Sequence, residues 1–135
     1  MNIGKYIYTL LSTTSAITDL VGTNIYPILL PQGAAYPAIV YMVNNAPNDI
    51  SKCPDPTHDK ATVSFHIWVD HAFGLDGYDT LEAIETALRT ALNGVEGTQM
   101  GIKVVSCRYD GSQDGRDDVM TMFIKDVTFT LIVKN

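Results

Sequence analysis

A cluster of carboxylates near the C-terminal end of the chain is the first candidate for chemistry. Residues 110–118 read DGSQDGRDD, in which Asp110, Ser112 and Asp114 follow the alternating spacing of a calcium-binding EF-hand loop, with a glycine at the sixth position. The twelfth position, which supplies a bidentate glutamate in such loops, is Thr121, and the flanking residues are typical of strands. A glycine-rich hairpin loop explains the same residues, because Asp and Gly tolerate positive φ angles. We therefore expect no metal ion at residues 110–118.

Histidine and cysteine side chains give no better catalytic or metal site. His66 and Asp70 share one face of a predicted strand but lie about 13 Å apart, which is too far for joint metal ligation. His71 points the other way if the strand continues, and Cys53 and His58 lie in a predicted loop without a base and its orienting group. Phosphate-binding and dinucleotide-binding motifs are absent as well. The sequence thus predicts no enzyme activity and no cofactor, with a small metal-binding or hydrolytic domain as an alternative.

Length and charge bound the class of protein. The chain has 135 residues, which suits a single domain over residues 1–135, with 46% hydrophobic and 18% charged residues. The net charge is −6, and the nine Lys and Arg residues are scattered singly, so no basic stripe is expected for binding DNA phosphates. No apolar run is long enough to span a membrane. Cys53 and Cys107 lack metal-ligand spacing and are read as free thiols in a reducing compartment, although a disulfide between them stays open.

Apolar spacing predicts where the helices lie. Asn2 and Ser15 are expected to cap two N-terminal helices, the second of which ends at Gly22. A longer helix is expected to begin at a capping Asp76, with Glu85 on its wetter side. The apolar face of this longer helix consists of Tyr78, Leu81, Ile84, Leu88, Ala91 and Leu92.

Runs of β-branched and aromatic residues predict the strands. In the last of them the apolar phase slips near Lys125-Asp126, which indicates a bulge or bend. Together with the helices, these strands predict an α+β fold: an antiparallel sheet of about four to five strands, with two main helices packed on one face. The expected strands cover residues 37–45, 61–70, 102–109 and 118–133.

The stretch from Ile25 to Tyr41 carries a pattern of prolines and small residues. Pro27 and Pro31 suit an edge strand, because each lacks a backbone N–H. The order of elements on both sides, over nearly the whole chain, resembles the tail completion (tail terminator) proteins of long-tailed bacteriophages. The residues that carry the resemblance are Leu20-Val21-Gly22, Ile25-Tyr26-Pro27 and Pro31-Gln32-Gly33-Ala34-Ala35-Tyr36-Pro37, followed by an apolar strand.

The resemblance implies a structural role without catalysis. Proteins of this family form hexameric rings that cap a finished tail tube, stop its polymerisation and offer the surface that joins the tail to the DNA-filled head. The implied partners are further copies of the chain, the tail tube protein and a head–tail connector or neck protein, with DNA only passing through the lumen and no membrane contact. The implied location is the head-proximal end of the virion tail, and the host cytoplasm during assembly. Another neck or head-closure role in a phage is the alternative.

Apolar surface is left over when two helices cover one face of the sheet, and such surface marks partner interfaces. Residues 44–60 add a predicted long loop with three prolines and little to bury, which we expect to engage a neighbouring subunit or the tail tube. The candidates for this subunit or tail-tube interface are Tyr41, Trp68, Asn48, Asp49, Ile50, Lys52, Asp55 and His58.

Overall fold

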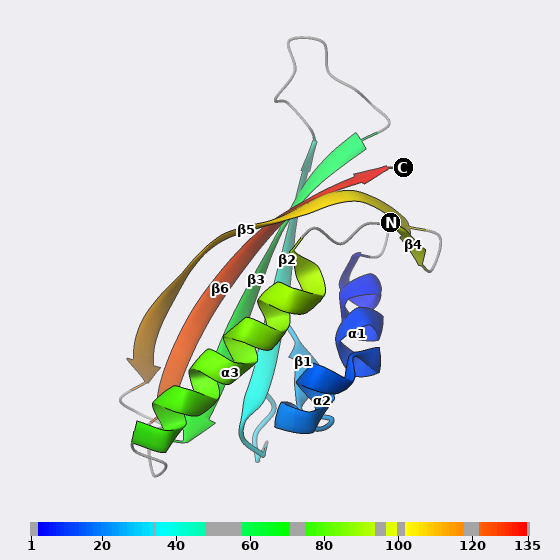
Figure 1. The fold of residues 1–135 in the computed structure, drawn as a ribbon. Coiled ribbons are helices and arrows are strands. Elements are labelled where there is room, and N and C mark those ends of the chain that lie inside the picture. The colour runs from blue at the N-terminus through cyan, green and yellow to red at the C-terminus, as the bar shows by residue number, and fades with distance from the viewer. Residues whose placement is uncertain are drawn as a thin grey trace.

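The protein folds as one curved six-stranded sheet with three helices on one side of it (Figure 1). The computed structural model describes residues 3–33, 35–47, 58–70, 75–93, 97–99, 102–117 and 122–134. The elements in chain order are α1 (Ile3–Thr13), α2 (Ser15–Val21), β1 (Ile25–Pro27), β2 (Ala38–Pro47), β3 (His58–Asp70), α3 (Leu75–Leu92), β4 (Gly97–Gln99), β5 (Ile102–Asp117) and β6 (Met122–Lys134).

The strand order β1-β2-β3-β6-β5-β4 places the three longest strands at the centre of the sheet or next to it. β1 runs parallel to β2, whereas all the other paired strands are antiparallel. The α+β class is confirmed. The expected all-antiparallel sheet of four to five strands is corrected to a mixed sheet of six, because two strands of only three residues lie at its edges.

The hydrophobic core lies between the sheet and the helices. Alternate residues of β3, from Ala61 to Val69, are fully buried, while the residues between them are only partly covered, as the alternation of the sequence predicts. Phe65 packs edge-on against Phe129 of β6 at 5.7 Å between ring centroids. Side chains of all three helices belong to the same buried cluster as these strand residues.

The two N-terminal helices follow their predicted apolar spacing. Ile3, Tyr6, Ile7 and Leu11 of α1 are buried, and so are two residues of α2. Thr14, not Ser15, is the N-cap of α2, and its hydroxyl gives no cap because it donates to the carbonyl oxygen of Leu10 at 2.7 Å. Gly22 ends α2 with φ 62, as its position predicts.

The β2–β3 hairpin is longer than the sequence indicates. Asn44 pairs with Thr62, and Pro47 still pairs with Asp59. The expected loop over residues 44–60 is therefore reduced to 48–57, which lies outside the described residues. The turn-forming residues Asn44 and Pro47 join the strand because the neighbouring ladder extends through them, so tertiary pairing overrides local preference.

Residues 110–117 form the last half of β5 and not the predicted hairpin loop. Their backbone pairs with β6 from Thr128 to Met122, with Gly111 at one of two register shifts. Gly111 has φ 153, so the glycine serves a bulge in β5. β6 itself pairs with β3 without interruption, so the bulge predicted at Lys125-Asp126 is wrong.

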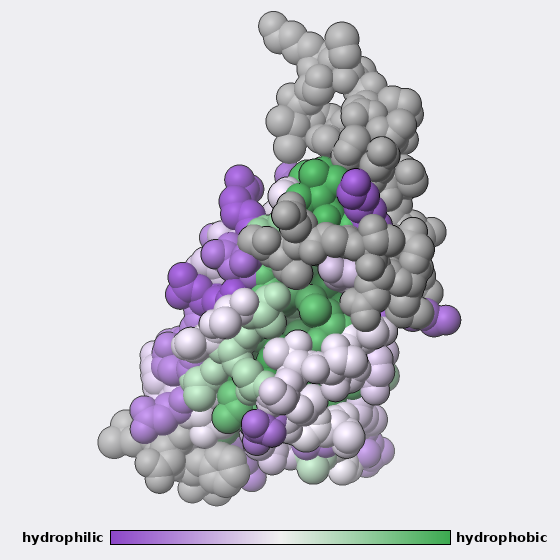
Figure 2. All heavy atoms as spheres, turned by 45° about the vertical axis from the view of Figure 1, so that its right-hand side comes forward, coloured by the Kyte–Doolittle hydropathy of each residue, from purple (hydrophilic) through white to green (hydrophobic). Residues whose placement is uncertain are grey.

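The helix side of the molecule is visible in Figure 2. Hydrophobic side chains gather in the middle of this face, and hydrophilic side chains lie along its left flank. Exposed Arg89 of α3 stacks over the ring of Tyr109 at 4.2 Å from its centroid. No helix among the described residues is long and apolar enough to cross a membrane.

Candidate protein interaction surface

The second face of the sheet carries an apolar region at its β2 side. β2 lies next to β3 with Ala38 opposite Trp68, Val40 opposite His66 and Met42 opposite Ser64. Met42 is 46% exposed, and none of the residues in the helix-side core cluster comes from this set. Both faces of β2 are apolar, and the sequence indicates that one of them faces away from the helices. That face carries Met42, whereas the face with Tyr41 lies against the helices.

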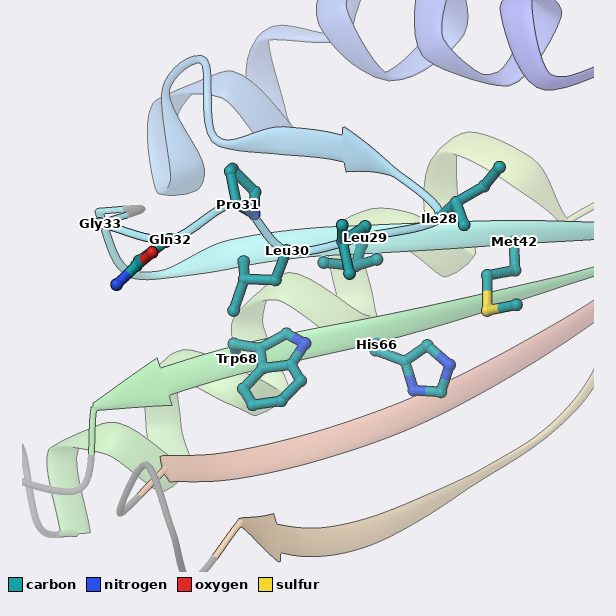
Figure 3. A pocket seen from close by; sticks show the side chains of 10 residues that line it. Ile28, Leu29, Leu30, Pro31, Gln32, Gly33, Met42, His66 and Trp68 are labelled. Atoms are coloured by element: carbon teal, nitrogen blue, oxygen red, sulfur yellow. The ribbon is translucent and has the colours of Figure 1, made fainter.

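A groove of about 570 Å³ lies on this face. Its floor is formed by Val40, Met42, His66 and Trp68, and one wall is the segment 28–33, which connects β1 to the start of β2 (Figure 3). Leu30 faces the indole ring of Trp68 in this view. Apart from the His66 ring, Gln32 and the indole N–H, the lining side chains are apolar, so the groove fits apolar groups of a partner.

The wall of the groove begins in a strained turn. Ile28 has φ 66, a left-handed conformation that a β-branched residue rarely adopts. Its N–H donates to the carbonyl oxygen of Tyr41 at 2.8 Å, and Leu29 N–H closes a three-residue turn on Pro27 at 2.6 Å. As a result, Ile28 and Leu29 are held outward with 72% and 75% of their surface exposed. Strain of this kind costs roughly 1–3 kcal/mol and is concentrated at functional sites.

Trp68 brings an unused hydrogen-bond donor to the groove. Its Nε1 is buried and makes no hydrogen bond, and it is the only such side-chain atom among the described residues. A buried N–H without an acceptor costs about 1–3 kcal/mol. A partner that supplied a carbonyl oxygen here would remove that cost.

A polar pocket of about 350 Å³ adjoins the groove. His66 belongs to both, and its Nδ1 lies 2.5 Å from Oδ1 of Asp126 on the neighbouring strand. The pair accounts for two of the polar side chains on this face of the sheet. Among the described residues, no group of three His, Cys, Asp or Glu side chains is arranged to hold a metal ion.

A buried ion cluster on the helix side holds α3 to the sheet. Lys125, whose side chain is 5% exposed, bonds to Glu82 and lies 3.1 Å from both Glu85 and Asp114. Burial alone would lower the pKa of Lys125, but the hydrogen bonds that its ammonium group donates to the three carboxylates outweigh burial and raise the pKa. The alternation of apolar residues in β6 is interrupted in the sequence because Lys125, a charged residue, occupies a position that faces the core.

The cluster corrects two predictions for α3. Glu85, expected on the wetter side, is 6% exposed, and burial would raise its pKa, but hydrogen bonds from Tyr109 and Lys125 lower it. Tyr78, expected on the apolar face, is 46% exposed and donates to Asp114. That hydrogen bond raises the pKa of Tyr78 and lowers the pKa of Asp114.

The predicted interface residues fall into three groups. Tyr41 is corrected to a core position: it is 3% exposed on the helix side, and its hydroxyl donates to the Gly4 carbonyl oxygen at 3.0 Å. Trp68 lines the groove. His58 opens β3 opposite Lys134. The remaining candidates, Asn48, Asp49, Ile50, Lys52 and Asp55, lie outside the described residues.

The segment 28–33 is the part of the surface that sequence reasoning missed. Ile28, Leu29 and Leu30 form a short apolar run between two prolines. Three consecutive large aliphatic residues in a segment that is neither helix nor strand were the available signal, because such residues have no element of their own in which to be buried.

A sheet face with an apolar groove, an exposed aliphatic turn and a donor without an acceptor defines a protein built for contact with other proteins. The chain belongs to the phage tail completion family: the family described as tail completion protein gp17 matches residues 5–134. It is therefore a structural component of phage tails, and the resemblance seen in the sequence is confirmed. A comparison with curated proteins found no match.

Two solved structures share the fold. The first is a chain in the virion of a native gene transfer agent particle, with a TM-score of 0.67 and 23% sequence identity, covering 96% of this chain and 92% of that chain. The second has a TM-score of 0.66 and 15% identity, covering 98% of this chain and 94% of that chain. At these identities the likeness concerns the fold alone.

Proposed function

We propose that the protein forms a ring, of six copies as the family resemblance implies, that caps the finished tail tube. The ring ends tube polymerisation and offers the surface that joins the tail to the DNA-filled head. Membership of the tail completion family supports a role at the end of the tail. The observation that carries the proposal is the groove with its exposed wall, because a monomer gains nothing by holding Ile28 and Leu29 in water.

The exposed wall offers free energy that favours assembly. Burying an exposed Leu or Ile side chain contributes about 1.5–3 kcal/mol. Ile28 and Leu29 together therefore offer several kcal/mol per copy, and an acceptor for Trp68 Nε1 adds to this. In a ring each copy uses this surface once, so a weak contact is repeated around the closed assembly.

Electron microscopy and tail-tube capping test the proposal. The purified protein is expected to form rings and to shorten tail tubes assembled in its presence. Leu29→Ser is expected to weaken the contact by about 2 kcal/mol, or about 30-fold in the dissociation constant. The control is Tyr8→Ser, since Tyr8 is also exposed, at 43%, but lies on α1 outside the groove. A wild-type protein that neither forms rings nor binds tubes contradicts the proposal.

The choice of partner separates this function from a head-closure or neck role. A terminator binds the tube protein first, whereas a head-closure protein binds the connector of the filled head. Co-purification with each partner, in separate mixtures, distinguishes the two. The engagement of residues 48–57 with a neighbouring subunit or the tube stays a prediction. It is tested by replacing them with a glycine–serine linker and measuring both folding and capping.

A further inference from the structure

The register of the sheet gathers lysines that are scattered in the sequence. Lys103 of β5 lies directly opposite Lys134 of β6, and Lys60 of β3 lies opposite Ile132, two residues before Lys134. Directly opposite residues share a sheet face about 5 Å apart, and diagonal neighbours lie about 7–8 Å apart. Lys60, Lys103 and Lys134, called the lysine end below, therefore occupy neighbouring positions at one end of the sheet, near the C-terminus in Figure 1.

Nothing described on the same chain neutralises the lysine end. Lys103 is exposed and Lys60 is partly exposed, and neither forms an ion pair with another described side chain. Arg108, farther along β5, is by contrast paired with Asp110 at 3.2 Å. Like charges in opposite positions of a sheet are destabilising. The lysine end is thus a local cost in a chain of net charge −6.

Carboxylates gather at the far end of the molecule. Asp79 and Glu82 lie on the first half of α3 and Asp114 lies near the end of β5; all three are exposed, and together they are called the acidic end below. Lys125 is the one ammonium group bonded to Glu82 and Asp114 among the described residues, and it also serves buried Glu85. The acidic end therefore keeps an excess of negative charge.

The two ends are too far apart to act on each other within one chain. Lys125 and Lys134 stand nine residues apart on β6, which is about 30 Å at the rise of an antiparallel strand. Electrostatic interactions between exposed charges are screened over about 8 Å at physiological ionic strength. The acidic end of the same chain therefore cannot neutralise the lysine end, whereas the acidic end of a second molecule can.

We propose that the lysine end of one copy contacts the acidic end of the next copy, an interface that rests on the proposed ring and specifies how its subunits meet. The contact joins two different surfaces of the same chain, and a repeated contact of this kind closes into a ring when the rotation between copies permits. DNA is the weaker candidate for the lysine end, because three lysines neutralise few phosphates in a protein with six excess negative charges.

Charge reversal with mixing tests the interface. Variant A carries Lys60→Glu and Lys103→Glu, and variant B carries Asp79→Lys and Glu82→Gln, which keeps an oxygen acceptor for Lys125. The control carries Lys5→Glu and Arg89→Glu, which changes net charge as variant A does but lies outside both ends. Circular dichroism and thermal melting establish that each variant is folded. Light scattering and electron microscopy measure the fraction of protein in rings.

Variants A and B are each expected to lose rings, while the control keeps them. A mixture of A and B is expected to regain rings, because the reversed ends of the two variants complement each other and their native ends still match. For the wild type, raising the salt concentration from about 0.05 M to about 1 M should dissociate rings, since the screening length falls to about 3 Å. This measurement tests for a charge-dependent contact even if a variant fails to fold, and rings that persist at about 1 M contradict the proposed interface.

Several results would overturn the interface. Variant A forming rings as the wild type does, or folded variants whose mixture stays dissociated, contradicts it while leaving the ring intact. Normal rings of variant A that no longer retain DNA would assign the lysine end to nucleic acid instead. A wild-type protein without rings under any salt condition overturns both the proposed ring and this contact.

Discussion

Replacing Lys125 by methionine is the most direct test of how α3 is held to the sheet. The change keeps the length of the side chain but removes the ammonium group that bonds to Glu82, Glu85 and Asp114. Glu85, with 8% of its side chain exposed, would be left as a buried carboxylate with hydrogen bonds only from Tyr109, at 2.9 Å, and Ser112 among the described residues. Leaving one member of a buried ion pair costs about 3–5 kcal/mol.

The structure favours the lower end of that range. Glu82 and Asp114 are 52% and 47% exposed, so water can solvate both once the lysine is gone. The loss then comes mainly from Glu85, and we expect Lys125→Met to lower the free energy of unfolding by about 3 kcal/mol. At a chain length of this order the melting temperature falls by about 9 °C.

Urea denaturation, followed by circular dichroism at a concentration where the protein is monomeric, measures the change. Glu85→Gln is the companion variant: it keeps the shape and leaves Lys125 two carboxylates, so its cost is about 1 kcal/mol. In the double variant the buried charge is gone, and the cost should be smaller than that of Lys125→Met alone. A Lys125→Met protein within about 0.5 kcal/mol of the wild type would refute the assignment of Glu85 as a buried charge held by this lysine.

Four further outcomes are expected. The pKa of Glu85 is lowered in the folded protein, so its contribution to stability is complete above its ordinary pKa of 4.5 and is lost as pH falls through the lowered value. The urea midpoint should therefore drop in acid, and it should drop less for Glu85→Gln. Ile28→Gly relieves the strained turn and should raise the free energy of unfolding by about 1 kcal/mol while weakening assembly; a destabilised monomer would contradict the strain. Burial, with a smaller effect of the Asp110 charge, raises the pKa of Cys107 to about 11. Alkylation of this thiol at pH 8, followed by peptide mapping, should therefore be about 100-fold slower in the folded than in the urea-unfolded chain. Equal alkylation rates would argue against burial. Trp68 fluorescence should shift to the red when rings dissociate, and an unchanged spectrum with dissociation verified by scattering would count against subunit cover of the groove.

The strand alternation of the core was the most predictable part of the fold. Period-two spacing from Ala61 to Val69 identifies the buried face of β3, because each of these residues is apolar and each neighbour is polar or amphipathic. Asp and Gly in residues 110–117 point instead to a turn, and only pairing with β6 turns them into a strand. Local preference is therefore informative where it agrees with burial and misleading where a long partner strand imposes its own geometry.

The candidate surface was predictable in kind but not in residues. An uncovered apolar sheet face follows from counting the helices, yet both faces of β2 are apolar, so the choice between Tyr41 and Met42 needs the register with β3. Lys125 illustrates the same limit: a charged residue within an apolar strand reads as an irregularity until Glu85 and Asp114 are seen around it. Both answers depend on contacts between residues distant in the sequence, which spacing alone does not encode.

The short outer strands have a consequence for how copies can add to one another. β1 and β4 have three residues each, and Pro27 leaves β1 with one backbone donor fewer. Beyond β4 most of β5 forms the margin of the described sheet, and its two register shifts, one of them at Gly111, distort the strand there. Bulges of this kind discourage a neighbouring chain from extending the sheet by strand addition. Association is directed instead to side chains, whose fixed angles can return a chain of subunits to its starting point. For the proposed role at the end of a tail tube, a sheet that recruits no further strands is an advantage.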